Sequence, residues 1–250
     1  MLKENERINE INESLHLIER VNGLTFGTDA YLLASFLPSR SRQIGVELGC
    51  GSGVVSLLAL SRKKCRQVYG IEVQEEFCEL SKRNAELNSL DDKLVAINKN
   101  VSDCKAEDVG GEVDFVFSNP PYMRTDSGKA NTHDEKNIAR HEVLGDISDF
   151  CACAKRLLKH GGNFYVVYRP DRLSDLIFAL KSNNLEPKKL TFIYPNPNTS
   201  PCLLLISAKL GAKSGMIVTE PIFIYKDGTQ EYTDRYKKIY ENCSLELDNE

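Results

Sequence analysis

Four consecutive residues, Asn119-Pro120-Pro121-Tyr122, form the part of this sequence best suited to chemistry on an amine. They follow a short apolar run at Val113 to Phe117 that predicts a buried strand. The two prolines restrict the backbone, so nearby carbonyl groups take fixed directions. The Asn119 side-chain oxygen and the Pro120 carbonyl oxygen can each accept a hydrogen bond from a planar, conjugated NH2 group, which turns the nitrogen lone pair toward an electrophilic methyl group. Tyr122 can then stack on the ring that carries the amine.

A glycine-rich turn, Glu47 to Gly53, reads ELGCGSG and lies between a predicted strand and a predicted helix. Its glycines allow the backbone to approach a ligand closely. The dinucleotide fingerprint would require glycine at position 54, which is Val54, so that fingerprint is absent. The pattern instead suits a ligand without a pyrophosphate, whose amino group can meet Glu47. Glu72 ends the next predicted strand, where a carboxylate can accept both hydroxyls of a ribose.

Alternating strands and helices must position these two segments. We predict seven strands and four helices in the region that follows residue 43. The strands are 44–49, 67–73, 94–97, 113–117, 163–168, 190–194 and 202–208, and the helices are 54–62, 74–88, 147–159 and 170–182. This order predicts an α/β fold of the Rossmann-like type, with a seven-stranded, mostly parallel sheet and helices on both faces. Only the turn PNPNTSP separates the last two strands, so they should form an antiparallel hairpin at the C-terminal end of the sheet.

The segments before and after this region have weaker patterns. A helix is predicted from Ala30 to Leu37, capped by Thr28 or Asp29. Residues 214–240 suggest a short strand pair and a terminal helix. Because there is no repeat and no clear linker, we predict a single domain with an N-terminal cap segment (1–43), a core (44–210) and a C-terminal extension (211–250).

Composition excludes several classes of protein. The chain has 250 residues, of which 41% are hydrophobic and 27% charged, which excludes a disordered or fibrous protein. There is no apolar run long enough for a membrane span and no signal-peptide pattern at the start, so a cytoplasmic location is expected. The eight cysteines include no Cys-x-x-Cys pair, and we expect reduced thiols and no metal site. The oligomeric state stays open.

Charge is distributed unevenly along the chain. The formal net charge is −4, which by itself argues against a nucleic-acid partner. Residues 151–213, however, contain ten lysines and arginines against three acidic residues, whereas the last ten residues contain four acidic residues and no base. Lys155, Arg156 and Lys159 lie on one predicted helix, where they could contact phosphates or be ordinary solvated side chains. The chain is therefore electrically two-sided along its sequence, and the partner that the basic segment faces stays open at this point.

At the glycine-rich turn and at Asn119-Pro120-Pro121-Tyr122 the sequence resembles the S-adenosylmethionine-dependent amino-methyltransferases that act on adenine N6, guanine N2 or glutamine N5. Three more stretches, Gly23 to Ala34, Ala139-Arg140-His141-Glu142 and Pro221 to Tyr225, are similar to the tRNA1(Val) adenine-N6 methyltransferase family. The resemblance covers about residues 6 to 240. It implies methyl transfer from S-adenosylmethionine to the N6 amine of an adenosine in tRNA, just 3′ of the anticodon of a valine tRNA.

The resemblance also implies which residues hold the cofactor. The methionine part would contact Glu47, Gly49, Cys50, Gly51 and Gly53. The ribose would be held at Glu72 and Val73, and the segment from Phe26 through Thr28 to Asp29 would close over the site. Near the adenine, Asn100 and Val101 occupy the position where related families often place an acidic residue, and Asp103 is the rival. Asn119 would serve both the cofactor pocket and the target amine.

Three other functions remain open at this point. The first is an N6-adenine methyltransferase acting on ribosomal RNA or DNA. The second is a protein glutamine N5 methyltransferase acting on release factors, although such enzymes usually have a helical N-terminal domain for which this chain has little room. The third is a cofactor-binding protein without catalysis, which would have no need for an intact Asn119-Pro120-Pro121-Tyr122.

Overall fold

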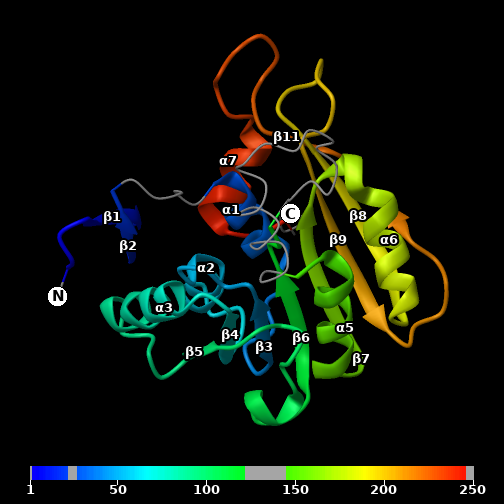
Figure 1. Ribbon diagram of the computed structural model, residues 1–250. Coiled ribbons are helices and arrows are strands. Elements are labelled where there is room, and N and C mark those ends of the chain that lie inside the picture. The colour runs from blue at the N-terminus through cyan, green and yellow to red at the C-terminus, as the bar shows by residue number, and fades with distance from the viewer. Residues whose placement is uncertain (1, 22–26, 122–144, 246–250) are drawn as a thin grey trace, which may run out of the picture.

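A computed structural model describes residues 2–21, 27–121 and 145–245 of the chain (Figure 1). All seven predicted strands are present in its main sheet, within a few residues of the expected limits. They are β3 (Ile44–Leu48), β4 (Gln67–Glu72), β5 (Leu94–Asn98), β6 (Val113–Ser118), β7 (Leu158–Tyr168), β8 (Leu185–Tyr194) and β9 (Leu203–Leu210). The fold class predicted from the sequence is confirmed.

The order of the strands places the carboxyl ends of β3 and β6 side by side. The sheet runs β8-β9-β7-β6-β3-β4-β5, and only β9 is antiparallel to its neighbours β7 and β8. Two very short strands, β10 (Ile217–Val218) and β11 (Ile222–Phe223), add to β8, so the sheet has nine strands instead of the seven expected. They pair with β8 in parallel and not with each other.

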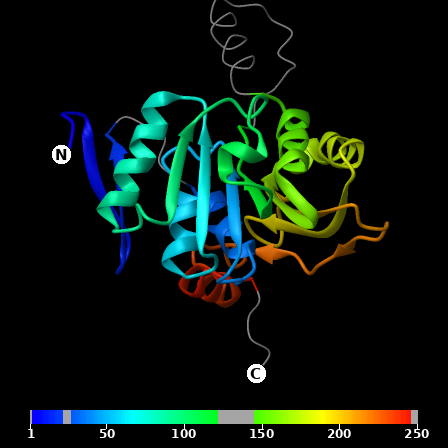
Figure 2. The ribbon, with the colours of Figure 1, turned by 90° about the horizontal axis from the view of Figure 1, so that it is seen from below.

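Helices cover both faces of the sheet, and they separate two cores. On one face lie α1 (Thr28–Phe36), α2 (Val54–Ser61), α3 (Glu75–Leu87) and α7 (Asp234–Asn242), and on the other lie α5 (Ile147–Leu157) and α6 (Leu173–Ser182). Figure 2 shows α7 (red) below the sheet and α5 and α6 (green to yellow-green) above it. Two 3-10 turns, η1 (Ala106–Val109) and η2 (Pro170–Arg172), complete the described elements.

An antiparallel hairpin at the N-terminus was not predicted. Strands β1 (Glu6–Asn12) and β2 (Leu15–Arg20) pair with each other and not with the main sheet. Side chains of α3 fix the hairpin: the Arg83 guanidinium lies 2.6 Å from the Glu6 carboxylate, and the Asn84 Oδ1 accepts a hydrogen bond from the Ile18 N–H at 2.7 Å. These contacts to α3 add to the pairing between the two strands. The sequence of the hairpin alone therefore gives only a weak indication of strands.

Two predicted boundaries are wrong. Helix α5 ends at Leu157, and β7 begins directly at Leu158, so Gly161 and Gly162 lie inside a strand instead of ending the helix. At this position the β6–β7 register shifts, and a Cβ on Gly162 would lie only 3.0 Å from the Asp114 carbonyl oxygen. The glycines therefore permit a close approach of two backbones, which a sequence pattern does not distinguish from a helix stop.

Helix α1 is buried on nearly every side and is anchored at its carboxyl end. The buried Lys64 ammonium donates hydrogen bonds to the carbonyl oxygens of Ala34, Ser35 and Leu37, at 2.8, 3.3 and 2.7 Å. A cation at this end offsets the unpaired carbonyls and the helix dipole. Helix α7 packs against the same helix, with the rings of Tyr31 and Tyr240 stacked at 4.3 Å.

Candidate active site

The glycine-rich turn follows β3 and opens α2. Gly49, Gly51 and Gly53 all have left-handed backbones, with φ of 71°, 52° and 83°. A Cβ on Gly53 would lie 2.5 Å from the Ser81 Oγ, whereas a Cβ on Gly51 would meet nothing within 4 Å. Gly53 is therefore required by packing below the turn. Gly51 borders open space above it, which fits a turn that admits a ligand.

Glu72, at the end of β4, holds this turn in place. Its Oε2 accepts a hydrogen bond from the Gly51 N–H at 2.9 Å, and its Oε1 accepts one from the Gln74 N–H at 2.9 Å. The side chain is only 5% exposed. A carboxylate has about four acceptor positions, so two remain for the hydroxyls of a ribose. The residues of the turn and Glu72 thus fit the amino-acid and ribose parts of S-adenosylmethionine.

Glu47 has a different environment from the one expected. The carboxyl group is 2% exposed, and its Oε2 accepts hydrogen bonds from the Ser56 N–H, at 3.1 Å, and from the Ser56 hydroxyl. Burial raises the pKa of Glu47 to about 8, against the lowering effect of Ser56. The visible contacts of Glu47 stabilise the first turn of α2. Its contact with a cofactor amino group stays a prediction.

Asn119 lies directly after β6 and is held by a residue from α1. The Asn119 Nδ2 donates a hydrogen bond to the Asp29 Oδ2 at 2.8 Å, and the Asp29 Oδ1 accepts one from the Ala30 N–H at 3.0 Å. Because an ionised carboxylate only accepts, the amide nitrogen of Asn119 must face Asp29. The Asn119 Oδ1 therefore points away from Asp29, as an acceptor in a defined direction. Below it, the Ser118 hydroxyl donates to the Leu48 carbonyl at 2.7 Å and ties β6 to β3.

The predicted cap of α1 is wrong in detail, and the correction brings α1 into the site. The N-cap residue is Gly27, without a side-chain cap, and Thr28 is the first helical residue. Burial raises the pKa of Tyr236 of α7 to about 12, against a lowering effect of the Thr28 side chain. Asp29 bonds to Asn119 instead of serving as the helix cap, so the segment predicted to close over the cofactor also contacts the residue that follows β6.

The loop after β5 is held from α5. The Arg156 guanidinium donates to three backbone carbonyl oxygens, those of Val101 (2.7 Å), Ser102 (3.0 Å) and Cys104 (3.1 Å). The Asn100 Oδ1 accepts from the Ser102 N–H at 2.9 Å. Arg156, which the sequence suggested as a possible phosphate contact, is thus exposed and hydrogen-bonded to backbone carbonyls of its own chain.

A second asparagine was missed by the sequence reading. The Asn98 Nδ2 donates to the carbonyl oxygens of Glu72 and Val73, at 2.9 and 3.0 Å, and so joins the ends of β4 and β5. Asp103 is exposed. The choice between Asn100 and Asp103 as the contact of the cofactor adenine stays a prediction.

The structure brings most of the predicted site residues to the carboxyl edge of the sheet, since β3, β4 and β6 are parallel neighbours there. Cys50, within the glycine-rich turn, is buried. Pro120 is also buried, whereas Pro121 is exposed. Phe26, Tyr122 and the loop from Arg124 to residue 143 lie outside the described residues.

The described part of the chain shows neither a metal cluster nor a membrane-spanning helix. Residues 2–21, 27–121 and 145–245 contain no cluster of three or more histidine, cysteine, aspartate or glutamate side chains that could hold a metal ion. Within the same ranges, no helix is long and apolar enough to cross a membrane. The eight cysteines are free thiols, and seven of them are buried.

Comparison with known proteins places this geometry in context. Residues 23–177 match the model of the methyltransferase small domain. A tRNA1(Val) (adenine(37)-N6)-methyltransferase of Phocaeicola vulgatus is 26% identical over 217 residues, which cover 86% of this chain and 90% of that protein. The enzyme of the same name from Dyadobacter fermentans is 24% identical, with 85% and 87% covered.

Solved structures show the same fold. A predicted O-methyltransferase from Agrobacterium tumefaciens superposes with a TM-score of 0.71 at 22% identity, over 89% of this chain and all of that chain. The M. jannaschii TYW2 in complex with AdoMet superposes with a TM-score of 0.56 at 16% identity, over 83% and 86%. The match to the family model spans more than half of the sequence, and it includes the glycine-rich turn, Glu72 and Asn119. The chain therefore belongs to the methyltransferase small domain family and is an S-adenosylmethionine-dependent methyltransferase.

Proposed function

We propose that this enzyme transfers a methyl group from S-adenosylmethionine to the exocyclic N6 amine of adenosine 37 in a valine tRNA. The relatives named above carry that activity in their names and match the chain over most of its length. The observation that supports the proposal within this chain is the 2.8 Å hydrogen bond from the Asn119 Nδ2 to the Asp29 Oδ2, because it fixes which end of the Asn119 amide faces Asp29.

One group of residues would hold the cofactor, and another would orient the target amine. The glycine-rich turn, Glu72, and the loop from Asn100 to Val101 would hold the cofactor. When bound, the cofactor supplies an electrophilic methyl group on a sulfonium sulfur. Asn119 Oδ1 and the Pro120 carbonyl would accept the two N–H groups of the amine, so that its lone pair faces that methyl carbon.

The reaction needs no strong base before the transfer. The N6 nitrogen forms the new N–C bond while the C–S bond breaks, with the electron pair going to sulfur. The nitrogen then carries a positive charge, which it loses with a proton to water. Asn119 and Pro120 therefore orient the amine and stabilise the charge that develops on it, and they do not have to remove a proton first.

A single labelling experiment tests the proposal. Purified protein is incubated with methyl-labelled S-adenosylmethionine and total tRNA, and the labelled nucleoside is located by digestion and mass spectrometry. We expect N6-methyladenosine at position 37 of a valine tRNA. Label in ribosomal RNA, in DNA, or on glutamine of a release factor, with none in tRNA, would contradict the proposal. A tRNA substrate also fits the cytoplasmic location expected from the sequence.

A further inference from the structure

A pocket of about 330 Å³ lies in the C-terminal extension, outside the site described above. It is lined by Glu220, Pro221, Phe223, Thr233 and Arg235. Phe223 belongs to β11 and Glu220 and Pro221 directly precede that strand, whereas Thr233 and Arg235 belong to the N-cap and first turn of α7. The volume is within the range of pockets that bind small organic groups. The Pro221 to Tyr225 segment, which carries part of the family resemblance, has no role in the chemistry proposed above.

The pocket opens at the same edge of the sheet as Asn119. In the parallel ladder Phe223 pairs with Tyr194, the last residue of β8. Because Tyr168 and Phe192 both pair with Leu204, the ends of β7 and β8 lie at a similar level, and Ser118 pairs with Val166 near the end of β7. Four strand spacings of about 4.8 Å separate β6 from β11, so the pocket is on the order of 20 Å from Asn119 along this edge.

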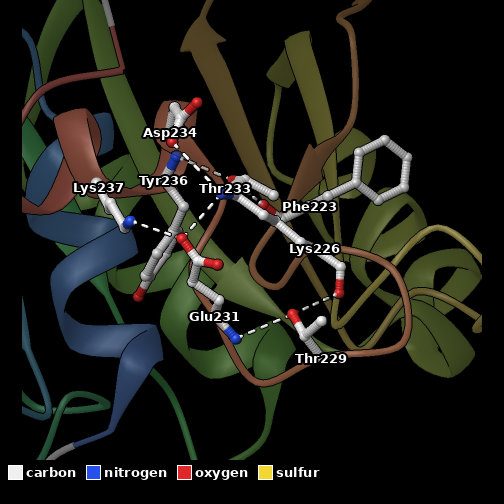
Figure 3. A network of polar contacts seen from close by, with 8 residues as sticks. All are labelled: Phe223, Lys226, Thr229, Glu231, Thr233, Asp234, Tyr236 and Lys237. Carbon is white, nitrogen blue, oxygen red and sulfur yellow. Dashed lines mark hydrogen bonds and ion pairs between the residues drawn. The ribbon is translucent and has the colours of Figure 1, made fainter.

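Phe223 gives the pocket an aromatic wall, and contacts with Tyr194 and Thr233 support this residue. The rings of Phe223 and Tyr194 lie 5.4 Å apart, tilted by 43°. The Thr233 hydroxyl donates to the Phe223 carbonyl oxygen at 2.7 Å and accepts from the Tyr236 N–H at 3.1 Å. Figure 3 shows the ring of Phe223 directed away from this polar network. The backbone that carries the ring is therefore held by α7, and the ring itself packs against Tyr194.

The guanidinium group of Arg235 also lines the pocket, and two neighbouring residues hold it in place. The Arg235 Nη1 donates to the Pro221 carbonyl oxygen at 3.1 Å and lies 3.6 Å from the carboxylate of Glu220, which is 89% exposed. Arginine has five N–H donors, more than these two contacts occupy. An aromatic ring beside an arginine is the combination that binds an unstacked nucleobase, with the ring on its face and the donors at its edge or phosphate.

The basic residues of the 151–213 segment favour a base-binding pocket over a surface that contacts only phosphates. Four of the ten basic residues of the 151–213 segment form ion pairs with acidic side chains: Lys159, Arg169, Arg172 and Lys181. Arg156 is bonded to backbone carbonyls. At least half of the basic residues of this segment therefore already have partners within the protein, and phosphate contacts carry no sequence information, so a specific base contact adds what the charge does not provide.

We propose that this pocket binds an unstacked nucleobase of the RNA substrate, a few nucleotides from the target adenosine, by stacking on Phe223 with Arg235 at its edge. This inference rests on the proposed tRNA function. It assigns to the C-terminal extension the recognition of RNA, in addition to its packing against α1.

The test uses the full chain and a hairpin RNA with the sequence of the tRNA anticodon arm. 2-Aminopurine, whose fluorescence is quenched by stacking, replaces each loop nucleotide in turn. We expect wild type to quench the probe at one loop position other than the target, and Phe223→Ala to lose that quenching and to weaken RNA binding by about tenfold or more. Phe223→Tyr should retain both.

The matched control is Phe178→Ala on α6, where the phenylalanine is 72% exposed and does not line the pocket. It should change neither signal. Affinity for S-adenosylmethionine, measured by calorimetry, should be unchanged in all three variants and shows that they are folded.

Equal RNA affinity and equal quenching in wild type and Phe223→Ala would overturn the pocket assignment, even if tRNA is methylated. Absence of methylation of any tRNA by wild type would overturn the proposed function, and the binding measurements would still decide on the pocket.

Discussion

The part of the site proposed to hold the cofactor and the part proposed to face the substrate amine differ in how far their contacts reach along the sequence. At the glycine-rich turn, Glu72 bonds to Gly51 and Gln74, and Glu47 bonds to Ser56, so these contacts join residues at most 21 positions apart. Asn119, in contrast, bonds to Asp29 across 90 positions. The shape of the glycine-rich turn therefore depends on local contacts, whereas the orientation of the Asn119 amide depends on a segment that is distant in the sequence.

The sharpest way to separate these two parts is Asn119→Ala. We expect turnover to fall by roughly 100- to 1000-fold, because the variant loses an acceptor that orients the amine. Affinity for S-adenosylmethionine should stay within a few-fold. Single-turnover kinetics and calorimetry measure the two quantities. Full turnover on any amine substrate would contradict the mechanism.

Glu72→Ala should weaken cofactor binding and leave turnover largely unchanged, the reverse of Asn119→Ala. The variant removes the acceptor of the Gly51 N–H and the proposed acceptor of the ribose, so the Kd for S-adenosylmethionine should rise about 100-fold. Turnover at saturating cofactor should change much less. Calorimetry gives the Kd, and an unchanged value would refute the ribose assignment.

Asp29→Ala tests whether Asn119 needs its partner. Without the carboxylate the Asn119 amide loses one hydrogen bond that orients it, and we expect kcat to fall by about 30-fold. Asp29→Asn is the matched variant, since its side-chain oxygen can still accept from the Asn119 Nδ2 and should restore part of the rate. Equal rates in wild type and Asp29→Ala would show that the hydrogen bond does not position the amide.

Arg156→Ala should affect the cofactor part of the site alone. Its three carbonyl partners lie in the loop after β5, so loosening that loop should raise the KM for S-adenosylmethionine by about five- to tenfold. The KM for RNA should stay the same. A rise in the RNA KM with an unchanged cofactor KM would instead return Arg156 to the role of a phosphate contact.

The smallest expected effect concerns pH and Glu47. Because burial raises its pKa from 4.5 to about 8, the folded protein binds this proton more tightly than the unfolded chain does. Its contribution to stability is present below about pH 4.5 and is lost as pH rises through about 8, with a slope of at most about 1.4 kcal/mol per pH unit. Urea unfolding of Glu47→Gln should show a flatter profile over pH 5–8. An identical profile would exclude Glu47 as the cause.

The same contrast explains which parts of the molecule could be predicted from the sequence. The seven strands and the glycine-rich turn have local patterns, and all of them were predicted. The partner of Asn119 could not be predicted, because nothing in the spacing of Asp29 indicates that α1 reaches the end of β6. The carbonyl contacts of Arg156 could not be predicted for a related reason, since the sequence pattern of a basic residue on a helix does not show whether its donors meet backbone carbonyls.

The hairpin β1–β2 and the short strands β10 and β11 were predicted poorly because their partners lie on other elements. Asn84 and Arg83 of α3 complete the hairpin, and β8 completes β10 and β11. For such segments the decisive interaction is tertiary, and strand propensity alone has little weight.

The docking of α7 on α1 has a consequence for the timing of activity in a growing chain. Helix α1 carries Asp29, is fixed by Lys64 near its end, and is covered by Tyr240 and by the segment in which Leu245 donates to the Ser35 carbonyl. When only the first 200 residues have emerged from the ribosome, the glycine-rich turn and Asn119 are outside, but α7, which packs over α1, is not. We expect a nascent chain to bind its cofactor early and to become able to modify RNA only when its last helix has left the exit tunnel.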